Sequence, residues 1–172
     1  MDWFAIFFRI LHIGAGVFWV GAAFLFFFFI EPSTHVLAPD PRQRFLGEIM
    51  GRRRVPIVIF LSSLVTVLAG LVLYVRGSSG FRVEWITSPV GIGFTLGALA
   101  AFASFFIGAL VILPTIRNLG MLGAQIATEG RPPSADEAAT LGGLERRLQL
   151  AGRWDLVGLT LAVLFMAIAR YL

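Results

Sequence analysis

Four long apolar segments constrain this chain more than any other feature. They cover residues 3–30, 55–75, 89–114 and 154–171, and each holds at least 18 residues. A helix of about 20 apolar residues crosses the hydrocarbon core of a bilayer, and it satisfies its own backbone hydrogen bonds there. The chain is 58% hydrophobic, with a mean hydropathy of +0.86. The sequence therefore predicts an all-α integral membrane four-helix bundle that forms one domain over residues 1–172.

The basic residues predict the orientation of the chain. All fourteen are arginines, and five lie in each of the two long connections, residues 31–54 and 115–153. Positive charge collects on the cytoplasmic side of membrane proteins. We therefore expect both connections in the cytoplasm and both termini outside, in the periplasm of a bacterial inner membrane. Charges confined to membrane borders make a nucleic-acid partner a poor explanation for the net charge of +4.

The two connections are expected to carry helical extensions of the bundle. The first membrane helix should end at Glu31-Pro32, because proline lacks the backbone N–H of a helix interior. The third should continue beyond Pro114 with a kink. A capping box that starts at Ser134 opens another helix. Gly142-Gly143 should interrupt that helix before the fourth membrane helix begins near Trp154.

The first apolar segment contains Arg9 and His12, and ionisable residues are rare inside a membrane helix. At 100° per residue, three residues share a narrow arc of this helix: His12, Gly16 and Trp19. Gly14 and Gly21 fall on the opposite side, where small residues let a neighbouring backbone come close. The pattern favours a helix packed inside a bundle, with His12 directed at a partner.

Three roles are open for His12: a haem or chlorophyll ligand, a proton relay, and a hydrogen-bonded packing residue. If His12 binds a haem, Arg9 can pair with a propionate. Considered without a haem, Arg9 is expected simply to extend its side chain to the membrane interface. Met166, at a similar depth in the fourth helix, is a candidate second axial ligand or simply a core filler. His35 lies 23 residues from His12, about 35 Å along a helix, and is too far away.

Several classes of site are disfavoured by the residues present. The chain has no cysteine, which excludes a disulfide, an iron–sulfur cluster and a covalent c-type haem within it. Apart from Asp2 and Glu84, the carboxylates lie in or beside the expected cytoplasmic connections. No paired acid–base set is therefore expected in the membrane, and no catalytic residues are assigned. A small transporter lacks support because no acidic residue is expected at the membrane midplane.

The pattern His12-x-x-x-Gly16-x-x-Trp19-x-Gly21, preceded by Leu11, resembles the first-helix signature of a superfamily of small bacterial membrane proteins. Its members include HemJ-type protoporphyrinogen oxidases, CopD-type copper-resistance proteins, the membrane part of cytochrome-linked urate oxidases and uncharacterised four-helix integral membrane proteins. The last group is most similar, with a third helix that ends in a motif like Pro114-Thr-Ile-Arg117. The specific part of the resemblance spans His12 to Gly21 and its flanking residues.

The resemblance implies that His12 corresponds to the b-haem ligand of the HemJ-type branch. That branch also uses a lysine in a later helix, and this chain has no lysine, which disfavours protoporphyrinogen oxidase activity. Two histidines and four methionines without cysteine are a poor ligand set for copper transfer. The expected function is therefore b-type haem binding in membrane electron transfer. The alternative is a cofactor-free accessory or structural subunit of a larger membrane complex or a homo-oligomer.

Overall fold

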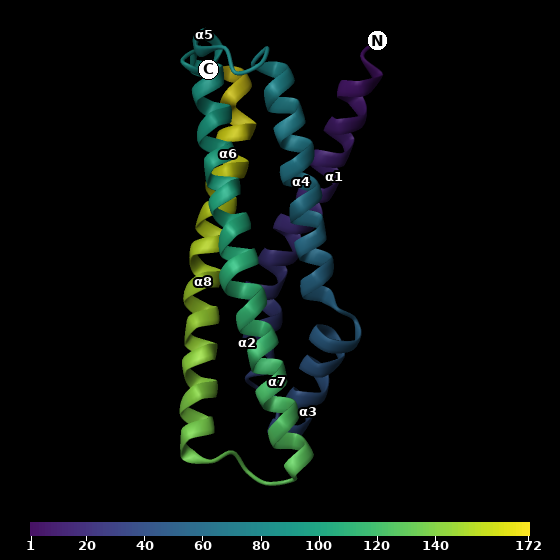
Figure 1. Cartoon of the computed structure of the whole chain (residues 1–172), viewed down its shortest axis with the longest axis vertical. Helices are drawn as coiled ribbons and strands as arrows, with labels where there is room; N and C mark the ends of the chain where they lie inside the picture. The colour runs from purple at the N-terminus through teal and green to yellow at the C-terminus, as the bar shows by residue number, and fades with distance from the viewer.

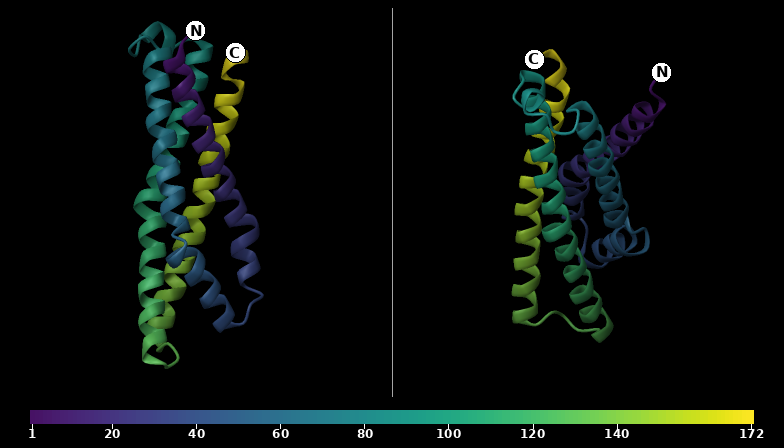
Figure 2. Two further views of the ribbon diagram at one scale, coloured as in Figure 1. Left: turned by 90° about the vertical axis from the view of Figure 1, so that its right-hand side faces the viewer. Right: turned by 45° about the horizontal axis from the view of Figure 1, so that its top comes forward.

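The computed structural model describes residues 1–172, apart from the side chains of Pro39 and Asp40. Every regular element in this described part is helical (Figure 1), and four helices in it are long and apolar enough to cross a membrane. The prediction of an all-α four-helix membrane bundle is confirmed. Both termini lie at one end of the long axis, together with the α4–α6 connection. The α2–α3 and α7–α8 connections lie at the other end, which is called the chain-reversal end below (Figures 1 and 2).

The first half of the chain holds two of the membrane helices. Its elements are α1 (Trp3–Leu25), a π-helical segment (Phe26–Ile30), α2 (Glu31–Thr34), α3 (Pro39–Leu46), a second π-helical segment (Gly47–Arg52) and α4 (Val55–Gly77). The second half begins with the short α5 (Val83–Ile86). It continues with α6 (Pro89–Ile107), a third π-helical segment (Gly108–Ile112), α7 (Leu113–Glu129), α8 (Ala135–Ile168) and a final 3₁₀ turn (Ala169–Tyr171).

The first hairpin is α1 packed against α4. The Ser62 hydroxyl of α4 donates a hydrogen bond of 2.8 Å to the backbone carbonyl of Ala15 in α1. At the end that holds the termini, Arg76 forms an ion pair with Asp2, and its guanidinium lies 5.5 Å from the centre of the Phe4 ring. The hydrogen bond from the backbone N–H of Ala5 lowers the pKa of the Asp2 carboxyl, and the positive charge of Arg76 lowers it further. The two helices are thus joined both at mid-length and at one end.

The second hairpin is α6 packed against α8 through small residues. A Cβ atom on Gly93 would lie 2.9 Å from the Ala169 Cβ, and one on Gly97 would lie 2.8 Å from the Met166 Cγ. Further along, Gly158 of α8 lies directly against the Ser104 hydroxyl of α6. Small residues let helix backbones approach closely, and this approach favours association in lipid. The glycine-rich third membrane segment therefore packs within the chain itself.

The two hairpins touch each other at fewer points. Between α4 and α6, the rings of Phe60 and Phe105 stack at 5.8 Å, and the Tyr74 and Thr95 hydroxyls share a hydrogen bond of 2.6 Å. Near the chain-reversal end, the Phe27 ring, in the π-helical segment that continues α1, packs against Gly152 of α8. Toward the termini, α1 leans away from α8 (Figures 1 and 2).

The helix starting at Trp3 does not end at Glu31-Pro32, and that prediction was wrong. The helix continues through Pro32 to Thr34, and the third membrane helix continues through Pro114 to Glu129 as expected. A π-helical segment precedes each proline. The N–H of Glu31 bonds to the Phe26 carbonyl, five residues back, and the N–H of Leu113 bonds to the Gly108 carbonyl in the same way. The wider turn shifts the hydrogen-bond register just before a residue that cannot donate.

Helix α8 is also longer than expected. Gly142-Gly143 was predicted to interrupt it, yet α8 is one helix of 34 residues. The capping box is present: the Ser134 N–H donates to the Glu137 carboxylate at 2.7 Å, and the Glu137 N–H donates to the Ser134 hydroxyl at 3.3 Å. Each glycine inside a helix costs roughly 1 kcal/mol relative to alanine. The two glycines are tolerated because the helix is capped before them at Ser134 and packed against α6 after them, and these two interactions outweigh the cost.

Gly158→Ala tests the close contact of α8 with α6. The added methyl group would collide with the Ser104 hydroxyl, so we expect a loss of about 1–3 kcal/mol in the free energy of unfolding. Thermal or denaturant unfolding in detergent micelles measures this loss. Gly142→Ala is the matched control because no described atom outside the backbone of its own helix lies within 4 Å of the added methyl group. A destabilisation by Gly142→Ala equal to that of Gly158→Ala would contradict the packing described.

Candidate functional site

His12 is anchored between α1 and α4. Its ring Nδ1 lies 2.8 Å from the backbone carbonyl oxygen of Thr66. A carbonyl only accepts hydrogen bonds, so the imidazole donates from Nδ1–H, and in the neutral ring Nε2 then carries the lone pair. No hydrogen bond to Nε2 is formed by the described residues. The neutral His12 ring therefore has a defined tautomer, and its Nε2 forms no hydrogen bond with the described residues.

The predicted partner face of α1 does meet another helix. A Cβ atom on Gly70 of α4 would lie 2.8 Å from the His12 Cε1, so the ring fits only because that position is glycine. The Thr66 methyl group covers Gly16, at 3.4 Å from where a Cβ would be. Trp19, on the same arc, is only 5% exposed. Side chains and backbone of α4 therefore occupy the small-residue gap beside His12.

The opposite face of α1, which carries Gly14 and Gly21, meets no partner among the described residues. No described atom lies within 4 Å of a Cβ built on Gly14 or on Gly21. Both glycines are exposed, and large apolar side chains beside them, including Val17 and Phe18, are exposed as well. This face therefore lies on the exposed surface of α1.

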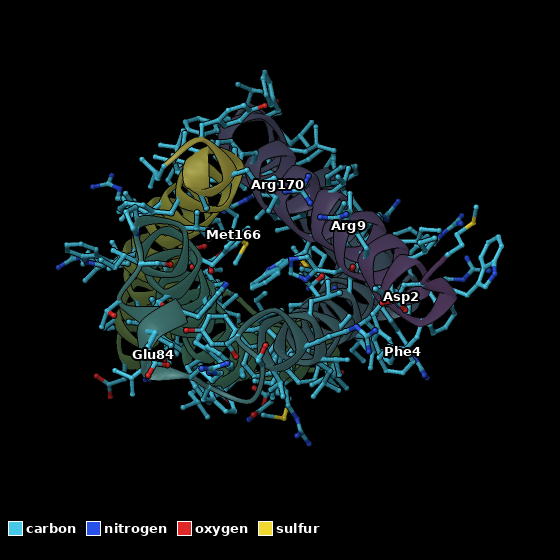
Figure 3. All side chains as sticks on the ribbon, turned by 90° about the horizontal axis from the view of Figure 1, so that it is seen from above. Asp2, Phe4, Arg9, Glu84, Met166 and Arg170 are labelled. Atoms are coloured by element: carbon cyan, nitrogen blue, oxygen red, sulfur yellow. The ribbon has the colours of Figure 1, made fainter. Side chains whose placement is uncertain are left out.

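The other predicted ligands are spread over two hairpins. Arg9 is exposed on α1, whereas Met166 belongs to α8 (Figure 3). A further exposed cation, Arg170, lies in the 3₁₀ turn that follows α8. The Met166 side chain lies across Gly97 of α6. The ion pairs among the described residues involve other arginines than Arg9 and Arg170. The suggested axial pair of His12 and Met166 stays a prediction.

His35 lies away from His12, as the distance along the helix requires. Its Nε2 is 2.9 Å from a carboxylate oxygen of Glu31, and the Gln149 side chain donates to the same oxygen at 3.2 Å. This group links the end of the first membrane helix to α8. Among the described residues, no three His, Asp or Glu side chains come together in a way that would hold a metal ion.

Asp155 is the residue that sequence reasoning missed. It was assigned to the border of a cytoplasmic connection, yet it lies in the α6–α8 contact with only 7% of its surface exposed. The Ser104 hydroxyl donates to the Asp155 backbone carbonyl at 3.1 Å, and the carboxylate Oδ1 is buried without a hydrogen-bond partner among the described residues. Helical spacing was the available signal, since Asp155, Gly158 and Ala162 share one face.

Asp155→Asn tests whether this buried carboxylate destabilises the folded protein. A buried polar group without a partner costs free energy, and an ionised one costs more than a neutral amide of the same shape. We expect the variant to gain about 1–3 kcal/mol in the free energy of unfolding, measured in micelles at neutral pH.

Asp136→Asn is the control, because Asp136 is exposed in the first turn of the same helix. It should change stability by less than about 0.5 kcal/mol. A clear loss of stability in Asp155→Asn would mean that the carboxylate makes a favourable interaction that the amide cannot replace.

Comparisons with known protein families, with curated proteins and with solved structures give no match. The geometry therefore carries the functional argument. It offers an oriented imidazole inside the membrane, a buried carboxylate between two other helices, and four helices arranged as two hairpins.

Proposed function

We propose that this protein binds b-type haem through His12 and takes part in membrane electron transfer. The observation that supports the proposal is the hydrogen bond from Nδ1–H to the Thr66 carbonyl. Histidines that ligate a metal commonly donate their second ring N–H to a carbonyl or carboxylate, which fixes the tautomer and the ring plane. In this arrangement Nε2 of His12 is the atom available to the iron.

The fit of the residues to the group is partial. A haem b, when bound, supplies a one-electron redox couple whose potential depends on its ligands and surroundings. His12 would hold it on one side, and its hydrogen bond would keep the imidazole basic and oriented. Arg9 and Arg170, at the termini end, have charges suited to carboxylates. Met166, whose Cγ packs against Gly97 of α6, would be the second ligand.

We also propose that the protein lies in the bacterial inner membrane with both termini in the periplasm. The fold supports the relative placement, because both termini lie at one end and the arginine-rich connections at the other (Figure 1). The excess of arginine in those connections favours the cytoplasm for that end.

The absorption spectrum of the purified protein is the direct test. The wild-type protein, purified from a host that makes haem, should show a Soret band that shifts on reduction with dithionite. His12→Gln should abolish the band, and His35→Gln should leave it unchanged because His35 is bound to Glu31 at the other end of the bundle. A folded wild-type protein without visible absorption after haem supplementation would refute haem binding.

A cofactor-free accessory subunit is the second candidate, and one observation favours it. The imidazole already fills the notch at Gly70, so His12 has a packing role without any cofactor. On this proposal His12 joins α1 to α4, and the uncovered face at Gly14 and Gly21 meets another membrane protein or a second copy.

Gly70→Ala tests the packing role of His12. The added methyl group would displace the ring from Thr66, so we expect a loss of about 1–3 kcal/mol in the free energy of unfolding. Gly14→Ala is the control, since its methyl group would meet no described side chain within 4 Å. Unchanged stability in Gly70→Ala would show that the ring is not held at this notch.

A further inference from the structure

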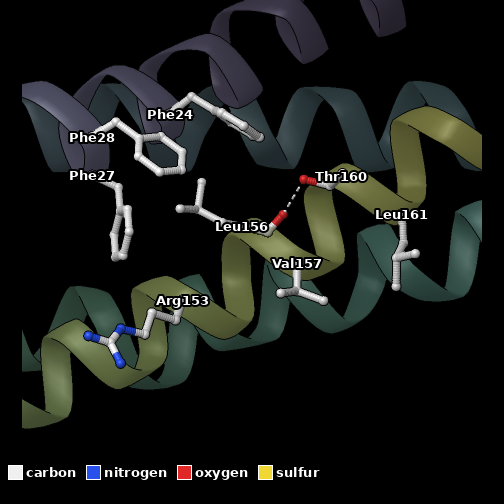
Figure 4. A pocket seen from close by; sticks show the side chains of 8 residues that line it. All are labelled: Phe24, Phe27, Phe28, Arg153, Leu156, Val157, Thr160 and Leu161. Atoms are coloured by element: carbon white, nitrogen blue, oxygen red, sulfur yellow. Dashed lines mark hydrogen bonds between the residues drawn. The ribbon is translucent and has the colours of Figure 1, made fainter.

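A groove lies between α1 and α8, on the termini side of the contact between Phe27 and Gly152. It has a volume of about 390 Å³. Its walls are formed by the following side chains: Phe24, Phe27, Phe28, Arg153, Leu156, Val157, Thr160 and Leu161 (Figure 4). It is independent of His12, which packs on the α4 side of the first helix.

The wall of the groove is apolar except at one end. Three phenyl rings come from α1 and the π-helical segment that continues it, and they face aliphatic side chains of α8. The Thr160 hydroxyl donates to the Leu156 carbonyl of its own helix at 2.7 Å (Figure 4), so it presents no free donor to a ligand. The remaining polar group is the guanidinium of Arg153.

Arg153 is exposed at the end of the groove nearer the chain reversal. The ion pairs among the described residues involve other arginines, and no aspartate or glutamate lines the groove. The positive charge therefore lacks a counter-charge within the groove.

The floor of the groove is closed toward the same end. The Phe27 ring lies against Gly152, at 3.3 Å from where a Cβ would be. Nearer the chain-reversal end, the Gln149 side chain donates a hydrogen bond of 3.2 Å to the Glu31 carboxylate. A ligand would enter sideways from the bilayer between two membrane helices. From Arg153 to Leu161 the groove follows α8 for eight residues, about 12 Å, which is most of one half of the hydrocarbon core.

We propose that this groove binds one anionic phospholipid of the leaflet on the chain-reversal side, with its phosphate on Arg153 and one acyl chain against Phe24, Phe27 and Phe28. The polarity of the groove matches such a lipid. The cation lies at the membrane border, where headgroups lie, and the apolar wall runs from there toward the bilayer centre. Arginine suits phosphate because its planar guanidinium donates two parallel hydrogen bonds.

The test uses the full-length protein in nanodiscs or micelles, with native mass spectrometry and thermal unfolding as readouts. Phosphatidylglycerol and phosphatidylcholine with identical acyl chains are the two lipid probes, and glycerol phosphate is the headgroup probe. The wild-type protein should retain one phosphatidylglycerol through delipidation and bind it about fivefold more tightly than phosphatidylcholine. Glycerol phosphate alone should neither remain bound nor raise the melting temperature.

Two substitutions separate the charge from the apolar wall. Arg153→Gln should remove the preference for phosphatidylglycerol and leave phosphatidylcholine binding unchanged. Val157→Trp should fill the groove and weaken both lipids; Val157 is half-exposed, so the larger side chain has room. If Val157→Trp fails to fold, Thr160→Phe serves the same purpose, because Thr160 also faces the groove and is exposed.

Arg147→Gln is the matched control for charge, since Arg147 is exposed on the same helix but does not line the groove. It should retain the full preference. If Arg147→Gln and Arg153→Gln reduced the preference for phosphatidylglycerol equally, the proposal would be overturned, and the preference would reflect a general attraction between arginines and anionic lipid. Undiminished lipid retention in a folded groove-filling variant would overturn it as well.

Discussion

Close contact between helix backbones holds this bundle together, because helices in lipid gain little from hiding apolar surface. Glycines permit that contact at two crossings. Gly158 of α8 meets Ser104 of α6, and Gly70 of α4 receives the ring of His12 from α1. Each crossing joins two helices of the same hairpin. The molecule is consequently two tight hairpins with a looser boundary, and the groove beside Phe27 lies in that boundary.

Helix α8 presents different chemistry on different faces. Asp155 is buried against α6, whereas Arg153, two residues earlier, is exposed beside the groove toward α1. Residues two apart lie about 200° apart around a helix and do not face each other. The two opposite charges therefore do not neutralise each other. A carboxylate is left within the second hairpin and a guanidinium at the boundary between hairpins.

The two proposed functions make different use of one geometry at His12. The hydrogen bond to Thr66 holds the ring in the notch at Gly70, and this packing alone accounts for a histidine inside the membrane. The same bond leaves Nε2 with its lone pair, which is what a haem iron requires. The lipid site at Arg153 depends on neither role, because it is built from the C-terminal end of α1, the π-helical segment that follows it, and α8.

The sequence alone determined the class of fold and the position of its most informative histidine. Apolar length specifies membrane helices, because a helix of about 20 apolar residues crosses the hydrocarbon core and forms its own backbone hydrogen bonds there. The predicted arc of His12, Gly16 and Trp19 was sufficient to find a partnered face. Only the tertiary structure decided what fills that face and where Asp155 lies. Helix pairing brings α4 to His12 and α6 to Asp155, and local periodicity marks which face of a helix is covered without indicating which distant helix covers it.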